Sequence, residues 1–327
     1  MSSSSYKKYL VTGGAGFIGS HLVEDLVARG HEVKVLDNFV TGKRENLLQL
    51  GDGRFLPNRD FELIEGDIRD YQTLLTTTAR LDGIFHQAAL GSVPRSVGDP
   101  LTTQDVNANG TLNVLWAAHK NGVQRVVFAS SSSVYGSSVT LPKREGSEGL
   151  PLSPYALTKK INEEHSKLFK DLYGLDTIGL RYFNVYGPRQ DPNSEYAAVI
   201  PRFVTRLLAG VSPIIYGTGL QSRDFTFVKD VVKANLMSME APTEVCGASY
   251  NVGRGDQINL LELLDNLKDL LGKRIDPVFE PTRPGDVMHS SADISLAREK
   301  LGFQAKWELR NGLEASIGYY AGTSASK

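Results

Sequence analysis

A glycine-rich turn between a predicted strand and a predicted helix constrains the fold of this chain more than any other feature. Gly13, Gly16 and Gly19 follow the apolar run 9–11 and precede an amphipathic stretch over residues 20–29. The first glycine permits a tight turn, the second lets a pyrophosphate approach the backbone, and the third lets helix and strand pack closely. Because amides at a helix N-terminus bind phosphate, this spacing predicts a dinucleotide site.

The first half of the chain continues as short apolar runs separated by helical segments. The runs predicted as further strands are 32–36, 61–66, 84–87, 125–129 and 177–182, with the last one closing the sheet. Strands that alternate with helices in this way indicate an α/β fold with a doubly wound parallel sheet, the Rossmann fold. After residue 184 the chain is richer in turns, which predicts a smaller domain built from loops. We therefore predict a dinucleotide-binding domain over 1–181 and a substrate domain over 182–327, with part of 223–255 returning to the first domain.

An acidic residue at the end of the second predicted strand indicates which dinucleotide binds. Asp37 lies 18 positions after the last glycine of the turn, where a carboxylate accepts hydrogen bonds from the adenosine ribose hydroxyls. The same carboxylate would repel a 2′-phosphate, so NAD is favoured over NADP, although Lys43 and Arg44 keep NADP open. Asp67 and Ile68 follow the third strand and are predicted to meet the adenine, with a plain turn aspartate as the alternative for the first of them.

A tyrosine and a lysine four residues apart are the candidate catalytic pair. Ser153 is a good helix N-cap and Pro154 suits the first helical position, so a helix is predicted to begin there. Tyr155 and Lys159 then lie on one face of that helix. A phenol has a pKa near ~10 and a neighbouring cation favours its ionised form, which would make a base able to take a proton from an alcohol. The same spacing also occurs on solvated helices, so this pair depends on the turn and Asp37 for its interpretation.

Composition excludes several classes of protein. The 327 residues contain 36 basic and 37 acidic side chains, and this balance argues against binding of nucleic acid or of a membrane surface through bulk charge. The single cysteine, Cys246, permits no internal disulfide and favours a reducing cytoplasm. No signal-peptide core or membrane span is predicted. The six histidines are scattered, and we predict no metal site.

In combination, the glycine turn, Asp37, Ser131, Tyr155 and Lys159 resemble the extended short-chain dehydrogenase/reductase family, and within it the bacterial UDP-N-acetylglucosamine 4-epimerases. The resemblance covers nearly the whole chain. The segments that carry the closer match are 91–96, 180–187, 189–193, 196–201, 222–225 and 283–286. The resemblance implies an NAD-dependent enzyme that oxidises and reduces C4 of a UDP-sugar through a 4-keto intermediate. It also implies a homodimer held by a four-helix bundle.

The resemblance assigns roles to individual residues. Tyr155 is the base, Lys159 lowers its pKa and holds the nicotinamide ribose, and Ser131 binds the sugar 4-oxygen, with Ser132 as the alternative in a run of four serines. Phe17, Ile18, Asn38 and Ala88 join the predicted cofactor contacts. The predicted substrate contacts are Ser92, Asn184, Gln190, Val199, Tyr216, Arg223, Arg283, Asp286 and Ser290, with Asn107 as a weaker candidate. The two arginines suit phosphate because guanidinium binds it in a bidentate manner.

The substrate is predicted to be an N-acetylated hexose. Where some UDP-galactose 4-epimerases carry a tyrosine, this chain has Ser290, which leaves room for a 2-N-acetyl group without excluding the smaller UDP-glucose. A UDP-glucuronate 4-epimerase is the alternative, with Arg95 to meet the carboxylate. A dehydratase or decarboxylase is less favoured, because Ser132 and Ser133 stand where those enzymes have acidic residues.

Overall fold

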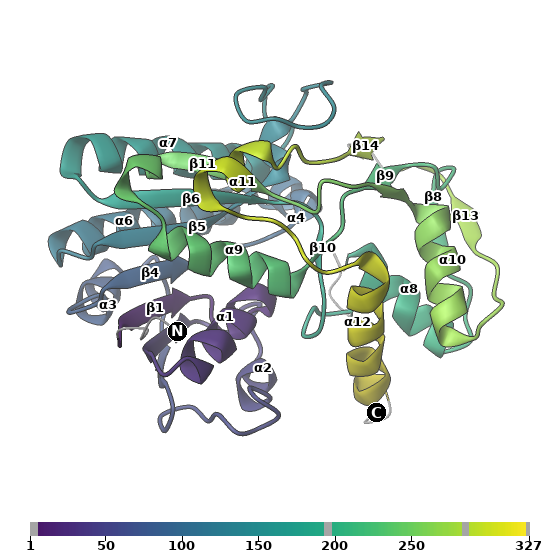
Figure 1. The fold of residues 1–327 in the computed structure, drawn as a ribbon, viewed down its shortest axis with the longest axis horizontal. Helices are drawn as coiled ribbons and strands as arrows, with labels where there is room; N and C mark the ends of the chain where they lie inside the picture. Colours follow the sequence, from purple (N-terminus) through teal and green to yellow (C-terminus); the bar gives the residue numbers. More distant parts are fainter. Residues whose placement is uncertain (1–5, 193–197, 283–287, 325–327) are drawn as a thin grey trace.

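A seven-stranded parallel sheet forms the centre of the molecule in the computed structural model, which describes residues 6–192, 198–282 and 288–324 (Figure 1). All neighbouring strands in this sheet pair in parallel. In spatial order the strands are β11 (Ala248–Val252), β6 (Asp176–Tyr182), β5 (Arg125–Ser131), β4 (Gly83–His86), β1 (Lys8–Thr12), β2 (Glu32–Asp37) and β3 (Glu62–Glu65). The predicted doubly wound fold is confirmed.

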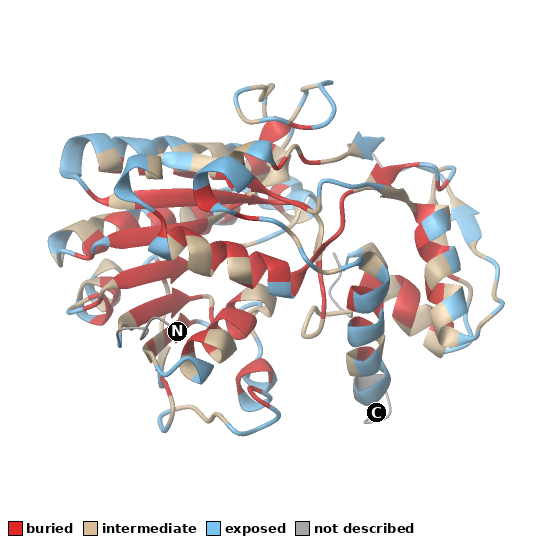
Figure 2. Ribbon diagram, viewed as in Figure 1, coloured by how far each residue is buried: buried red, intermediate tan, exposed pale blue. Residues whose placement is uncertain are grey.

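Helices cover both faces of the sheet. One face carries α1 (Phe17–Ala28), α2 (Arg44–Leu48), α9 (Val228–Glu240) and α11 (Ser295–Leu301), and the other carries α3 (Tyr71–Thr77), α4 (Val93–Gly98), α5 (Pro100–Gln104), the π-helix η1 (Asp105–Asn109), α6 (Gly110–Lys120) and α7 (Pro154–Tyr173). Side chains alternate along each strand, so Val11 is buried in the first core and Leu10 in the second. Two separate apolar cores therefore fix the strands between the helix layers (Figure 2).

The edge of the sheet differs from the prediction. We predicted that 177–182 closes the sheet, but β11 pairs in parallel outside β6, with Tyr250 opposite Leu180. The chain reaches this edge after α9, which packs against β5 and β6. This return is invisible in local periodicity because it depends on a crossover from the second half of the chain. The proposed boundary at 181/182 with a return of part of 223–255 stays a prediction.

Among the residues that the structure describes, the other part of the fold is built from three helices and small sheets. The helices are α8 (Val199–Leu208), α10 (Leu260–Leu271) and α12 (Leu309–Ser324). The short strands pair as β7 (Val185–Tyr186) with β10 (Thr226–Phe227), as β8 (Ile214–Tyr216) with β13 (Val278–Glu280), and as β9 (Ser222–Arg223) between β12 (Ile258–Asn259) and β14 (His289–Ser290). A third core, which includes Phe203, Leu264 and Tyr320, holds these elements together. Two 3-10 turns, η2 (Ser132–Tyr135) and η3 (Thr243–Val245), complete the connections.

Within the described ranges, none of the helices has the length and apolar character required to span a membrane. In the same part of the chain, no three His, Cys, Asp or Glu side chains gather in a way that could hold a metal ion.

Candidate active site

The glycine turn forms a tight cradle between β1 and α1. Gly13 has φ +69°, and a Cβ there would lie 2.6 Å from the backbone nitrogen of Ala88. A Cβ at Gly19 would lie only 2.1 Å from the carbonyl oxygen of Gly13. Gly16 is the N-cap of α1, and a Cβ there would meet only that same carbonyl oxygen, at 3.1 Å. The cradle is therefore shaped by the absence of side chains, which suits a pyrophosphate at the helix N-terminus.

A cavity of about 430 Å³ lies beside this cradle and brings most of the predicted cofactor residues together. The predicted residues that line it are Gly13, Gly16, Phe17, Ile18, Gly19, Asp37, Asn38, Ile68, Ala88, Tyr155 and Lys159. Asp67 does not line it. Its carboxylate accepts hydrogen bonds from Asn38 and Arg69, each at 2.8 Å, and the Arg69 guanidinium lowers the pKa of Asp67 to about 2. The contact of Asp67 with adenine therefore stays a prediction, beside the alternative of a turn aspartate.

Asp37 is held in place at the end of β2. It is buried, and its two oxygens accept backbone N–H groups from Ala15 at 2.9 Å and Phe39 at 2.8 Å. Burial raises the pKa of this carboxyl, and the two hydrogen bonds oppose that shift. Each carboxylate oxygen has a further lone pair for a ribose hydroxyl.

Lys43 and Arg44, which left NADP possible as the cofactor, form ion pairs away from Asp37. Lys43 Nζ lies 2.8 Å from Asp191, and Arg44 pairs with Glu65 and lies over the Phe39 ring. Neither side chain is therefore directed at Asp37, where a 2′-phosphate would have to bind. The cradle, the buried carboxylate and the engaged cations together fit NAD.

The candidate catalytic pair, Tyr155 and Lys159, lies on α7. Ser153 Oγ accepts the backbone N–H of Ala156 at 3.1 Å, Pro154 is the first helical residue, and Gly174 ends the helix with φ +67°. Lys159 is buried and its Nζ donates to the carbonyl oxygen of Ala129, at the end of β5, at 2.7 Å. This bond joins the helix to the strand that carries the serine run.

The pKa of Tyr155 is not shifted in the predicted direction. Burial raises it, and a hydrogen bond with Ser131 opposes that shift. Burial lowers the pKa of Lys159 to about 8, and the charge of Glu163 opposes this. In the protein by itself, burial therefore outweighs the bond with Ser131. The lowering of this pKa by the Lys159 ammonium and by the nicotinamide charge stays a prediction.

The serine run leaves strand β5 and enters η2, so its hydroxyls have different surroundings. Ser131 is the serine that bonds with Tyr155, and its Oγ also accepts the backbone N–H of Ser133 at 3.2 Å. Ser130 is buried and donates to Glu163 Oε1 at 2.5 Å. This geometry favours Ser131 over Ser132 as the hydroxyl beside Tyr155.

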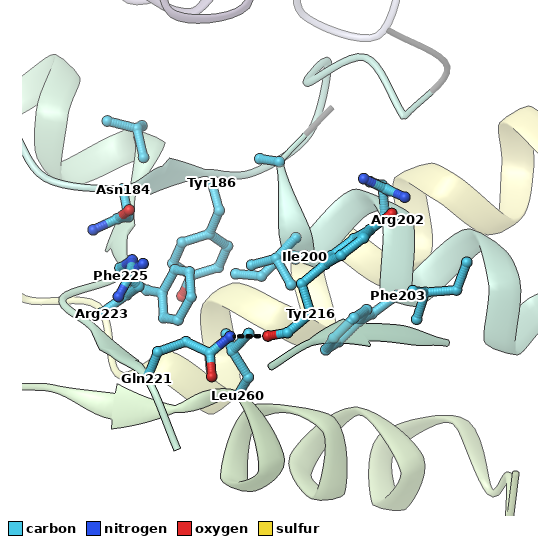
Figure 3. A pocket seen from close by; sticks show the side chains of 14 residues that line it. Asn184, Tyr186, Ile200, Arg202, Phe203, Tyr216, Gln221, Arg223, Phe225 and Leu260 are labelled. Carbon is cyan, nitrogen blue, oxygen red and sulfur yellow. Dashed lines mark hydrogen bonds between the residues drawn. The ribbon is translucent and has the colours of Figure 1, made fainter. Parts of the chain in front are cut away.

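A second cavity, of about 260 Å³, lies between β7, α8, β8 and β9 and has mostly apolar and aromatic walls (Figure 3). Four predicted substrate residues line it: Asn184, Val199, Tyr216 and Arg223. Figure 3 shows Asn184 and Arg223 at one end, while Arg202 lies 5.9 Å over the Tyr216 ring at the other. The cavity also includes Tyr186, Phe203, Phe225 and Leu260, which sequence reasoning missed because apolar residues at helical and strand spacing are indistinguishable from core. Gln221, which also lines it, lies in a turn-rich segment and carried no signal of its own.

Other predicted substrate residues are placed elsewhere. Ser92 caps α4 by accepting the Arg95 N–H at 3.3 Å, and Gln190 donates to the Val185 carbonyl at 3.0 Å; neither lines the two cavities. The buried side chain of Asn107 accepts from the backbone N–H of Leu90 and donates to its carbonyl, so it supports a loop rather than a sugar pocket. Ser290 lies on β14 in register with Arg223 on β9. Arg283 and Asp286 lie outside the described residues.

Comparisons with known proteins agree with this geometry. The model of the NAD dependent epimerase/dehydratase family matches residues 9–253. A UDP-glucose 4-epimerase from Mycolicibacterium smegmatis is 40% identical over 318 residues, which are 96% of this chain and 99% of the relative. Among solved structures, the UDP-N-acetylglucosamine 4-epimerase from Methanobrevibacter ruminantium M1, in complex with UDP-N-acetylmuramic acid, has a TM-score of 0.91 at 40% identity, covering 97% of this chain and 99% of that one. The UDP-glucose 4-epimerase from Thermus thermophilus, in complex with NAD, has a TM-score of 0.85 at 36% identity, covering 96% and 99%.

The chain therefore belongs to the NAD dependent epimerase/dehydratase family, as a member of the extended short-chain dehydrogenases/reductases with NAD as its cofactor. The family and the cofactor predicted from the sequence are both confirmed.

Proposed function

We propose that this protein is a 4-epimerase that interconverts UDP-N-acetylglucosamine and UDP-N-acetylgalactosamine, and also UDP-glucose and UDP-galactose, through a 4-keto intermediate. The observation that carries the proposal is that Tyr155 and Lys159 line the cofactor cavity, with Ser131 next to Tyr155, and that a second cavity suited to a nucleotide lies nearby. Tyr182 lines the first cavity and Asn184 lines the second, so the two lie at the same end of β6.

In this proposal the second cavity holds the UDP group. The Tyr216 and Phe203 rings offer apolar surface to the uracil, and the Arg223 guanidinium suits the diphosphate. The sugar would then extend from the diphosphate toward Tyr155. Binding through the nucleotide leaves the sugar able to turn, which is what presentation of either face of C4 requires.

The residues of the site supply binding and proton transfer. Bound in the cavity beside the glycine turn and Asp37, NAD would supply the chemistry of hydride transfer at C4. Ser131 would bond the 4-oxygen, and Tyr155 would take the proton of the 4-hydroxyl and give it back after the sugar has turned. Since burial raises the pKa of Tyr155, the base form depends on positive charge at the site, from the Lys159 ammonium and from oxidised NAD together.

The chain lacks a second acid for elimination at the positions where a dehydratase would carry one. Ser132 and Ser133 occupy those places in η2. The carboxylate that contacts the serine run, Glu163, is paired with Arg181. A paired, buried carboxylate is poorly placed to take a proton from C5, which favours epimerisation.

Ser290 is the proposed size limit for the 2-substituent. Replacing it with Tyr is expected to lower kcat/KM for UDP-N-acetylglucosamine at least tenfold more than for UDP-glucose, because a clash of one bulky group is worth about 1–3 kcal/mol. Steady-state kinetics on both substrates measure this, and Ser290→Ala, which stays small, should leave the ratio unchanged. Equal decreases of kcat/KM on the two substrates would show that Ser290 does not limit the size of the 2-substituent.

The proposed epimerase acts in the cytoplasm as a homodimer. Leu157, Leu168 and Leu172 are exposed along one side of α7, and Leu112 is exposed on α6. Their spacing forms an apolar seam of the kind that packs two helices of one subunit against two of another.

Charged residues in place of the exposed leucines of α7 are expected to separate the two subunits of the proposed dimer. Leu168→Glu with Leu172→Glu should convert the wild-type dimer into a monomer, as measured by light scattering coupled to size-exclusion chromatography. The control is Leu220→Glu, an exposed leucine elsewhere in the chain. A monomeric wild type, or a double variant that remains dimeric, would contradict the α7 interface.

The proposed function is tested with purified protein and UDP-N-acetylglucosamine, UDP-glucose or UDP-glucuronate. We expect the galacto epimers of the first two without net accumulation of NADH. Preference for the glucuronate would support the alternative substrate, and a dehydrated or decarboxylated product would contradict epimerisation.

A further inference from the structure

A buried carboxylate lies directly behind the proposed catalytic pair and has no part in the proposed proton transfer. Glu163 is one helical turn beyond Lys159 on α7, and its side chain is only 10% exposed. It accepts the Ser130 hydroxyl at 2.5 Å. Tyr155, Lys159 and Glu163 thus follow one another at four-residue spacing along the face of α7 that meets the end of β5.

Arg181 on β6 binds this carboxylate in a bidentate manner. Its Nε donates to Glu163 Oε1 at 2.9 Å and its Nη2 donates to Oε2 at 2.8 Å. The same guanidinium pairs with Glu148 and donates to the Tyr135 hydroxyl at 3.0 Å. A charge taken out of water is costly unless it is paired in this way, so the network offsets the cost of burying Glu163 while joining α7 to β5 and β6.

Several charged or titratable groups surround Lys159. Tyr155 and Glu163 lie on its own helix, His86 approaches from β4, and Arg181 lies on β6 beyond Glu163. Burial together with Lys159 lowers the pKa of His86 to about 3, so this imidazole stays neutral above pH 5. Burial lowers the pKa of Lys159 to about 8, and Glu163 is the group that opposes this shift.

We propose that Glu163 is a positioning residue for the catalytic pair: its carboxylate anchors the end of β5 through Ser130 and places a negative charge one helical turn from Lys159. This inference rests on the proposed function of Tyr155 and Lys159. Both effects reach the same segment of β5. Glu163 bonds Ser130, which precedes Ser131, and Lys159 Nζ donates to the carbonyl of the neighbouring Ala129.

Glu163→Gln separates the charge from the contacts. The amide still accepts from Ser130, but it no longer opposes the loss of the Lys159 proton. Removal of a nearby opposite charge is expected to move the titration of Lys159 to lower pH by about one pH unit. The basic limb of the kcat profile should move in the same direction, because the ammonium form is lost at a lower pH.

The matched control is Glu148→Gln, which removes the other carboxylate paired with Arg181. Burial and Glu163 account for the shift in the pKa of Lys159. This control should therefore lower the free energy of unfolding without moving the Lys159 titration or the basic limb of the kcat profile. The direct readout is an NMR titration of 13C-labelled lysine, with the Lys159 signal assigned by its loss in Lys159→Arg. Because no substrate is needed, this readout holds even if the proposed epimerisation fails.

An unchanged Lys159 titration in Glu163→Gln, or an equal shift in both glutamine variants, would overturn the inference. Absence of epimerisation by the wild type would instead overturn the proposed function alone. Should Glu163→Gln not fold, Glu163→Gln with Arg181→Gln removes both charges of the pair. The double variant is expected to show the same shift toward lower pH, and an unshifted titration there counts against the inference equally.

Discussion

Tyr155→Phe is expected to lower the turnover of UDP-sugar epimerisation by about 10²–10⁴-fold, the range typical of a general acid–base group. Phenylalanine keeps the ring on α7, where Tyr155 lines the cofactor cavity, and removes only the hydroxyl that bonds with Ser131. The Kd for UDP-N-acetylglucosamine should change little, because the nucleotide is proposed to bind in the other cavity. Coupled assays of product and isothermal titration calorimetry measure the two quantities.

Tyr182→Phe is the matched control for this loss. Tyr182 lines the same cavity, but its hydroxyl bonds with Gln87 and Asn235 rather than with a serine of the catalytic run. We expect a stability loss and a turnover within about tenfold of the wild type. Near-normal epimerisation by Tyr155→Phe, or equal losses in both variants, would remove Tyr155 as the base.

Gly19→Ala is expected to abolish NAD binding. The added Cβ would lie 2.1 Å from the Gly13 carbonyl oxygen and 2.8 Å from the Gly14 Cα. Both are backbone atoms of the cradle, so α1 must move away from β1 and the helix N-terminus leaves the pyrophosphate position. Overpacking of this kind also lowers the free energy of unfolding by roughly 1–3 kcal/mol.

The same substitution elsewhere provides the control. Gly318 lies within α12, and a Cβ there meets nothing within 4 Å. Gly318→Ala should retain NAD and gain about 0.5–1 kcal/mol, because alanine favours a helix over glycine. NAD content after purification and thermal unfolding separate the two variants. A Gly19→Ala protein that copurifies with NAD as the wild type does would show that close packing at this glycine is not required.

Features that depend on residues close together in the chain were predictable from the sequence. The glycine turn and Asp37 determine a strand–turn–helix unit over about 25 residues, and both line one cavity in the structure. Ser153 and Pro154 define the beginning of α7 through local hydrogen bonding and a fixed φ. In each case the physical cause acts within a few positions along the chain.

Features that depend on distant partners were not predictable. β11 joins the sheet beside β6 after a long excursion of the chain, so local patterns placed the sheet edge wrongly, although a return of part of 223–255 to the first domain was predicted. The raised pKa of Tyr155 follows from burial by several elements, whereas the helix spacing showed only Lys159. Glu163 has no sequence signal of its own, because its significance arises from Arg181, 18 residues later on another element.

The central claim is that the hydrogen of C4 leaves the sugar and returns to the same carbon while Tyr155 handles only the hydroxyl proton. Incubation of the wild-type protein with UDP-N-acetylglucosamine deuterated at C4, followed by mass spectrometry of both epimers, tests this directly. The account predicts that the galacto epimer keeps its deuterium at C4 after many turnovers. Exchange of that deuterium for solvent hydrogen, at the rate at which the epimer forms, would contradict it.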